Sequence, residues 1–153
     1  MNHNAEIISM GTGRYGDPAC DSGGVTMTDE QRTTLISAAQ SVRRNAYAPY
    51  SNYYVGAAIM AKSGKIYTGA NFENAAFGAG TCAERVALGS ALSAGEREFE
   101  AICVCGQDSD ITPCGICRQA LWEFGDIAVI CCDESGNAYD YTLKELLPGG
   151  FRM

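Results

Sequence analysis

Three cysteines constrain the fold of this chain more than any other feature of its sequence. Cys114 and Cys117 form a C-x-x-C pair, and Cys82 lies earlier in the chain. The C-x-x-C spacing lets two thiolates converge on one metal ion, and catalytic zinc commonly takes three ligands from the protein and keeps a fourth position open. If Cys82 supplies the third thiolate, two segments that are far apart in sequence must meet at one ion.

All three cysteines lie where the sequence predicts the start of a helix. Apolar residues at helical spacing predict one helix over about residues 82–94, and Pro113 opens another that ends near Phe124. The exposed amides and the dipole of a helix N-terminus lower the pKa of a thiol and favour the thiolate that a metal binds. Residues two apart in a regular helix point to nearly opposite sides. Glu84 can therefore lie at the same metal centre as Cys82 only if Cys82 is the cap or the first residue of the helix.

Composition restricts the ligand set. The one histidine, His3, belongs to residues 1–24, which show no sustained periodicity and which we expect to form an irregular N-terminal extension. A metal site in the core therefore uses cysteine or carboxylate. Three thiolates leave a Zn²⁺ centre with a net charge of about −1, which opposes the deprotonation of bound water. Arg85 is expected to hydrogen-bond one thiolate and offset this charge, and Arg118 is a second candidate.

Two other uses of the cysteines stay open at this point. A structural zinc site needs a fourth ligand, which Cys131 or Cys132 could supply, although an adjacent pair inside an apolar run is poorly placed to turn toward helix ends. A C-x-x-C pair is also typical of redox proteins. Glu84 favours a catalytic site, because a carboxylate beside the ligands is superfluous around a structural ion.

The remaining patterns predict one α/β domain over residues 25–153. A capping box at Thr28 opens a helix that should end before Pro49, and a second box at Thr142 opens a short helix that stops at Pro148. Strands are expected over residues 53–61, 66–70, 101–106, 127–132 and 138–141. Strands that alternate with helices need crossover connections, so we expect a three-layer α-β-α fold around a mixed five-stranded sheet.

Composition also argues against several classes of partner. The net charge of −7 disfavours binding to a nucleic acid polymer. No apolar run approaches the roughly 20 residues of a transmembrane helix, and the N-terminus lacks the pattern of a secretory signal, so we expect no membrane association and a cytoplasmic location. We therefore expect all eight cysteines to be reduced. Cys20 has no assigned role. Four others should pack as small apolar side chains: Cys103, Cys105, Cys131 and Cys132.

Residues 28–151 resemble the cytidine deaminases. Zinc deaminases share a histidine or cysteine, any residue, a glutamate and then P-C-x-x-C, and this chain matches that signature with Cys82 in first place. Further motifs follow in the same order: Pro49-Tyr50-Ser51, Val55-Gly56-Ala57-Ala58, Gly69-Ala70-Asn71-Phe72-Glu73-Asn74-Ala75, Pro113-Cys114-Gly115-Ile116-Cys117-Arg118-Gln119 and Glu145-Leu146-Leu147-Pro148. The chain resembles the small, homotetrameric type with three cysteine ligands.

The resemblance implies the chemistry of the centre. One Zn²⁺ per subunit, on Cys82, Cys114 and Cys117, would activate water for attack on the pyrimidine carbon that bears the amino group. Glu84 would carry a proton from that water to the ring nitrogen and later one to the departing ammonia.

The resemblance also implies contacts to the substrate and to a neighbouring subunit. Asn71 and Glu73 would hydrogen-bond the ribose, the Ala83 amide would contact the base, and Tyr53 stands where the family usually has a phenylalanine against the substrate. Two aromatic residues, Phe77 and Phe151, are candidates for contacts with a neighbouring subunit, although Phe151 could equally cover its own core.

The expected reaction is hydrolytic deamination of cytidine and 2′-deoxycytidine to the uridines, with release of ammonia, in pyrimidine salvage. The alternative is deamination of a modified aminopyrimidine nucleoside such as blasticidin S, but Asn71 and Glu73 favour an ordinary ribose. Tyr53, Phe72 and Phe77 depart from the family pattern and bear on which nucleoside is preferred. The charge disfavours a third possibility, the editing of polynucleotides.

Overall fold

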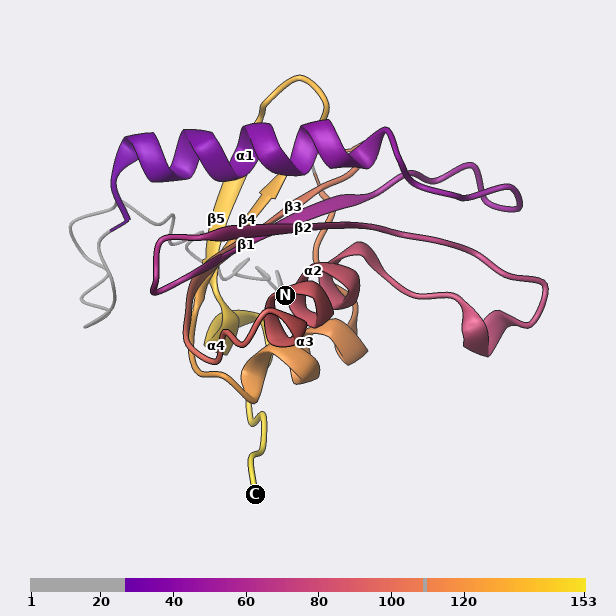
Figure 1. The fold of residues 1–153 in the computed structure, drawn as a ribbon. Coiled ribbons are helices and arrows are strands. Elements are labelled where there is room, and N and C mark those ends of the chain that lie inside the picture. The colour runs from indigo at the N-terminus through magenta and orange to yellow at the C-terminus, as the bar shows by residue number, and fades with distance from the viewer. Residues whose placement is uncertain (1–26, 109) are drawn as a thin grey trace, which may run out of the picture.

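A mixed five-stranded sheet forms the centre of the structure and confirms the expected fold class (Figure 1). Its strands are β1 (Gly56–Ala61), β2 (Ile66–Ala70), β3 (Phe99–Cys105), β4 (Ala128–Cys132) and β5 (Ala138–Thr142), in the spatial order β2-β1-β3-β4-β5. Strands β3 and β4 run parallel, and all other neighbours run antiparallel. The computed structural model describes residues 27–108 and 110–153, so the expected extension over residues 1–24, with His3 and Cys20, lies outside it.

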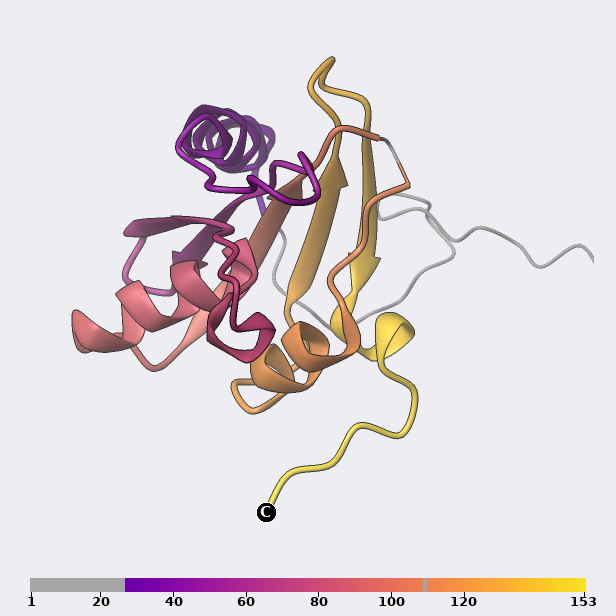
Figure 2. The ribbon, with the colours of Figure 1, turned by 90° about the vertical axis from the view of Figure 1, so that its right-hand side faces the viewer.

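Helices cover both faces of this sheet and complete three layers. Helix α1 (Asp29–Arg43) lies on one face, and α2 (Ala83–Ser93), α3 (Gly115–Trp122) and the short α4 (Leu143–Leu146) lie on the other (Figures 1 and 2). Both predicted capping boxes form: Thr28 caps α1 and Thr142 caps α4, each with its reciprocal side-chain hydrogen bond.

The strands bury alternate side chains against opposite helix layers. In β1, Ala57 and Ile59 face the core under α2 and α3, whereas Ala58 and Met60 face Leu35 and the rest of α1. Because successive residues of a strand point to opposite faces, a sheet covered on both sides needs an apolar residue at nearly every position. The continuous apolar runs of the sequence follow from this arrangement.

The cysteines outside the predicted metal site are core residues, as expected. Cys103 and Cys105 lie in β3, and Cys131 and Cys132 lie in β4, all of them buried. All seven cysteines of the described residues are free thiols. Packing, and not covalent cross-linking, therefore holds this part of the chain together.

The segment between α1 and β1 differs from the prediction. Helix α1 ends at Arg43, not just before Pro49, and β1 begins at Gly56, not at Tyr53. The reason is tertiary: the Tyr47 amide donates to the Asn71 carbonyl oxygen at 2.9 Å, and the Glu73 amide donates to the Tyr47 carbonyl oxygen at 2.7 Å. These backbone hydrogen bonds align Tyr47, which the local pattern assigns to the helix, with the segment after β2.

Helix α2 lies unusually close to β2, and one glycine permits this. A Cβ atom on Gly69 would lie 2.4 Å from the Ala87 nitrogen and 2.5 Å from the Ala83 carbonyl oxygen. Real Cβ atoms do not approach backbone this closely, so only glycine allows the first turn of α2, which carries Ala83 and Glu84, to rest on the sheet.

This close contact makes Gly69 sensitive to the smallest substitution. We expect Gly69→Ala to destabilise the protein by about 2 kcal/mol, because overpacking forces α2 away from the sheet. The matched control is Gly89→Ala in the same helix, where a Cβ meets no atom within 4 Å. That change should stabilise the protein by up to ~1 kcal/mol, since alanine favours the helix. Urea unfolding of both variants checks this, and equal stabilities would contradict it.

Candidate metal centre and substrate cavity

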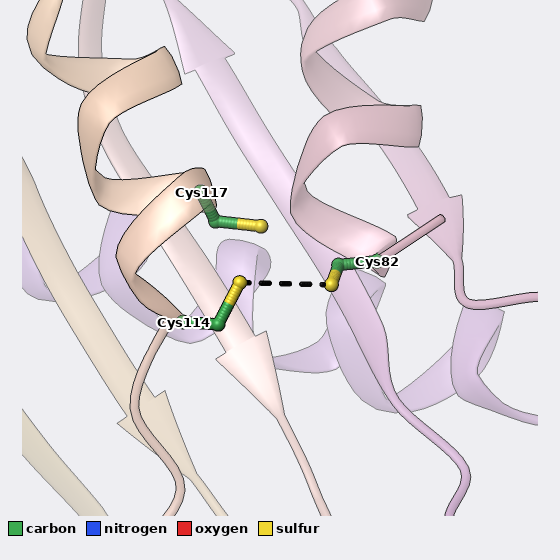
Figure 3. Close-up of side chains that lie close together, drawn as sticks. All are labelled: Cys82, Cys114 and Cys117. Carbon is green, nitrogen blue, oxygen red and sulfur yellow. Dashed lines mark hydrogen bonds between the residues drawn. The ribbon is translucent and has the colours of Figure 1, made fainter. Parts of the chain in front are cut away.

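The three predicted ligands converge from the starts of two helices (Figure 3). Cys82 is the N-cap of α2 and Cys114 is the N-cap of α3, while Cys117 lies in the first turn of α3. Neither cap side chain bonds a helix amide, so both thiols are available to a ligand. The Sγ atoms all lie within 4.8 Å of one another, and those of Cys82 and Cys114 are 3.8 Å apart.

These separations fit a single tetrahedral zinc ion. Zn–S bonds of about 2.3 Å at tetrahedral angles separate two sulfur atoms by about 3.8 Å. Among the described residues no other group of three or more metal-ligating side chains converges in this way. Of the two residues considered as a fourth ligand of a closed structural site, Cys132 belongs to the core under α1 on the opposite face of the sheet. Cys131 packs in the core under α2 and α3 but is not part of the converging group.

The electrostatics of the site favour a thiolate at Cys82, whereas the hydrogen bond to Cys82, and then burial, raise the pKa of the Cys117 thiol. Hydrogen bonding from Cys117, followed by that from Arg85, lowers the pKa of the Cys82 thiol to about 5. Arg85 Nη2 lies 3.9 Å from Cys82 Sγ. In the part of the chain that the structure describes, Arg85 Nε is the one buried side-chain nitrogen or oxygen atom without a hydrogen-bond partner. The guanidinium group thus lies where it can offset the negative charge of the sulfur atoms.

Glu84 lies beside the cysteines, with its side chain withdrawn from solvent. It follows the cap by two residues, in the first turn of α2, and it is 4% exposed. Burial raises the pKa of its carboxyl group to about 7. The requirement that Cys82 be the cap residue for Glu84 to share its centre is met, because the chain enters the helix at Cys82 in an extended conformation (φ −75°, ψ 153°).

A cavity of about 990 Å³ joins this cluster to the other predicted contacts. Tyr53, Asn71, Glu73 and Ala83 line it together with Glu84, and so does Phe77. Sequence reasoning gave no role to several further lining residues, which are Tyr50, Ser51, Asp110, Ile111 and Thr112. For Ser51 the signal was present, since Pro49-Tyr50-Ser51 is one of the motifs that carry the family resemblance.

The Tyr53 hydroxyl group lies close to Gly106, the residue that follows β3. A Cβ on Gly106 would lie 2.9 Å from this oxygen, so the phenol packs directly over a glycine. Burial, and then the nearby Asp108 and Asp110, raise the pKa of Tyr53. The hydroxyl that distinguishes this tyrosine from the phenylalanine usual in the family therefore lies beside the loop after β3, and part of that loop also lines the cavity.

The two aromatic residues predicted to reach a neighbouring subunit are both exposed. Phe77 lies in a 3-10 turn (Phe77–Ala79) and is 88% exposed. Phe151 is 69% exposed and lies outside the cavity lining, with its carbonyl oxygen accepting from Gln119 Nε2 at 3.0 Å.

Comparison with known proteins shows the family of this chain. The family model for the cytidine and deoxycytidylate deaminase zinc-binding region matches residues 29–133. This chain belongs to that family. A probable cytidine deaminase of Dictyostelium discoideum is 42% identical over 127 residues, 82% of this chain and 86% of that protein. The cytidine deaminase of Halalkalibacterium halodurans is 43% identical over 123 residues, 78% of this chain and 93% of that protein.

Solved structures of other deaminases share the fold. The crystal structure of cytidine deaminase from Burkholderia pseudomallei is 45% identical with a TM-score of 0.75, and the match covers 82% of this chain and 100% of that chain. Cytidine deaminase from Mycobacterium tuberculosis is 31% identical with a TM-score of 0.70, covering 83% and 100%. Within the described residues of this deaminase family member, no helix has the length and apolar character needed to cross a membrane.

The cysteine cluster predicts which thiols hold metal. We expect Cys114→Ala to lose most of the bound zinc, because two thiolates no longer complete the protein's share of a tetrahedral site. Cys103→Ala removes a buried thiol from the sheet and should leave the metal content unchanged, which makes it the matched control. Elemental analysis of the two purified variants measures the difference. Equal zinc contents would show that the metal lies elsewhere.

Proposed function

We propose that this chain is a zinc-dependent cytidine deaminase that converts cytidine and 2′-deoxycytidine to uridine and 2′-deoxyuridine and releases ammonia. Membership of the deaminase family supports this reaction. The observation that carries the proposal is the buried Glu84 carboxyl beside three converging thiols in one cavity. That combination supplies a metal site and a proton carrier at the same place, as hydrolysis of a C–N bond requires.

Cys82, Cys114 and Cys117 would hold the zinc ion, one per subunit. When bound there, zinc supplies a Lewis acid that lowers the pKa of water and so provides a nucleophile near neutral pH. Arg85 keeps its positive charge against the Cys82 sulfur, which limits the negative charge that the thiolates bring to the centre. Cys82, Cys114 and Glu84 line one cavity, so an ion held there would be accessible to a ligand in that cavity.

Glu84 moves the protons of the reaction. Its carboxylate accepts a proton from the attacking water and donates it to the ring nitrogen, and a second transfer makes the amino group a neutral leaving group as the C–N bond breaks. Burial shields these transfers from bulk water, so a proton taken up by Glu84 goes to the substrate.

The rest of the cavity selects a nucleoside. The Ala83 amide and the Tyr53 ring would contact the base, and Asn71 and Glu73 would bind the sugar. Acidic lining residues, among them Glu73 and Asp110, and a net charge of −7 disfavour a polyanionic nucleic acid.

The proposed enzyme is a cytoplasmic homotetramer. Phe77 and Phe151 expose large apolar surfaces, which a neighbouring subunit would cover. The tetramer rests on the family resemblance, and pyrimidine salvage is the setting that it implies.

Replacement of Glu84 tests its role in proton transfer. We expect Glu84→Gln to lower kcat for cytidine by roughly 10²–10⁴-fold, because the amide cannot carry protons. Zinc should remain bound, since the three thiols are unchanged. The control is Glu123→Gln, an exposed position at the end of α3. The decrease in cytidine absorbance measures turnover, and full activity in Glu84→Gln would remove this residue from the mechanism.

A substrate series tests the assignment of the sugar contacts. We expect kcat/KM to be highest for cytidine and 2′-deoxycytidine and lower by at least about tenfold for free cytosine, which forfeits every sugar hydrogen bond. Blasticidin S should also react more slowly. Product analysis by chromatography gives all four rates, and a preference for cytosine would contradict the roles of Asn71 and Glu73.

A further inference from the structure

Ser51 lies in a tight turn at the edge of the substrate cavity. The Asn52 amide closes this turn by donating to the Ala48 carbonyl oxygen at 3.0 Å, and Asn52 adopts a left-handed conformation with φ 55°. Asparagine tolerates that conformation better than most residues do. The turn presents the Tyr50 and Ser51 amides and the Ser51 hydroxyl to Glu73, which comes from the segment after β2.

Glu73 is held by three donors from this one turn. Its Oε2 atom accepts from the Tyr50 amide at 2.8 Å and from the Ser51 amide at 3.2 Å. Its Oε1 atom accepts from the Ser51 hydroxyl. The hydroxyl oxygen in turn accepts from the Tyr53 amide at 3.0 Å, which orients its hydrogen toward the carboxylate. Ser51 thus connects Glu73 to the backbone of Tyr53, another lining residue.

This arrangement leaves one acceptor site on the carboxylate. An ionised carboxylate has about four lone-pair positions, and the three bonds to the turn occupy both positions on Oε2 and one on Oε1. The hydrogen bond from Ser51 is the largest cause of a lowered pKa for Glu73, so the group remains an acceptor. The remaining position, on Oε1, is left for a donor from the ligand.

Asn71 offers the complementary group. Its Oδ1 atom accepts from the Val55 amide at 2.8 Å, and its Nδ2 atom donates to the Tyr53 carbonyl oxygen at 2.9 Å. One N–H of this amide remains. Together, Glu73 and Asn71 present one acceptor and one donor, which suit a single sugar hydroxyl, because that group can donate one hydrogen bond and also accept.

We infer that Ser51 is a positioning residue for sugar recognition, whose hydroxyl holds Glu73 Oε1 so that its last lone pair faces a hydroxyl of the nucleoside. This inference rests on the proposed function. Without the Ser51 hydroxyl, Oε1 gains a second vacant position and loses the bond that prevents rotation of the carboxylate. The enzyme should then stabilise the transition state less well for nucleosides with a hydroxyl on the ribose ring, and equally well for nucleosides without one.

The test compares three substrates in the full-length enzyme. Cytidine and 2′-deoxycytidine carry a hydroxyl on the ribose ring, and 2′,3′-dideoxycytidine carries none. In Ser51→Ala, we expect kcat/KM to fall about tenfold for the first two, as expected for loss of a bond to a charged group, and to change less than about twofold for the third. Ratios between substrates do not depend on the fraction of folded enzyme, so partial loss of stability cannot imitate this result.

Two further variants sharpen the comparison. Ser51→Thr keeps the hydroxyl and should keep the parent ratio between substrates. Ser63→Ala is the matched control, since Ser63 also donates to a carboxylate, Glu96 Oε1, at 2.8 Å but lies on the exposed surface. It should leave all three rates unchanged. In a Glu73→Gln background, Ser51→Ala should have no further effect on cytidine, because the two residues act through one contact.

The outcomes separate this inference from the proposed function. If the parent chain does not deaminate cytidine, the proposed function is wrong. If the parent is active and Ser51→Ala slows all three substrates equally, or slows none, Ser51 does not act through sugar recognition and only the inference is overturned. Additive effects of Ser51→Ala and Glu73→Gln would overturn it as well.

Discussion

The convergence of three thiols on one point is the constraint on which the rest of the site depends. Thiolates this close repel one another unless a cation lies among them, and the structure brings a guanidinium group and two helix N-termini to that place. The topology makes this meeting possible. Helix α3 connects the parallel strands β3 and β4, so it starts beyond the end of β3, and the start of α2 meets it there.

A second contact, between the turn before β1 and the segment after β2, shapes the opposite wall of the cavity. Here the backbone of Tyr47 pairs with Asn71 and Glu73, and the side chain of Glu73 returns to the turn at Ser51. Under the proposed function, the metal cluster would lie at the reacting end of the nucleoside, and this backbone pairing would hold Asn71 and Glu73 at the end that carries the sugar. The close packing of α2 on β2 at Gly69 connects the metal cluster to this pairing, because Glu84 lies in the first turn of α2 and Asn71 directly follows β2.

Much of the fold could be predicted from sequence because its signals are local. Capping boxes at Thr28 and Thr142, apolar runs for strands and the C-x-x-C pair each act over a few residues, and each appears in the structure. The errors lie where distant segments compete with local preference. Helix α1 stops early because Tyr47 pairs with residues after β2, and no pattern near Tyr47 announces that pairing.

The sequence by itself determined the ligand chemistry and the family, because the identity of Cys82, Cys114, Cys117 and Glu84 and their spacing depend on nothing else. Only the tertiary structure decided what the other polar groups do. A carboxylate such as Glu73 can be solvated, paired or held for a ligand, and its partners come from a turn 22 residues away. The direction of the Tyr53 hydroxyl depends on Gly106 in the same way. Hydrogen-bond partners depend on distances between atoms, which only the folded chain defines.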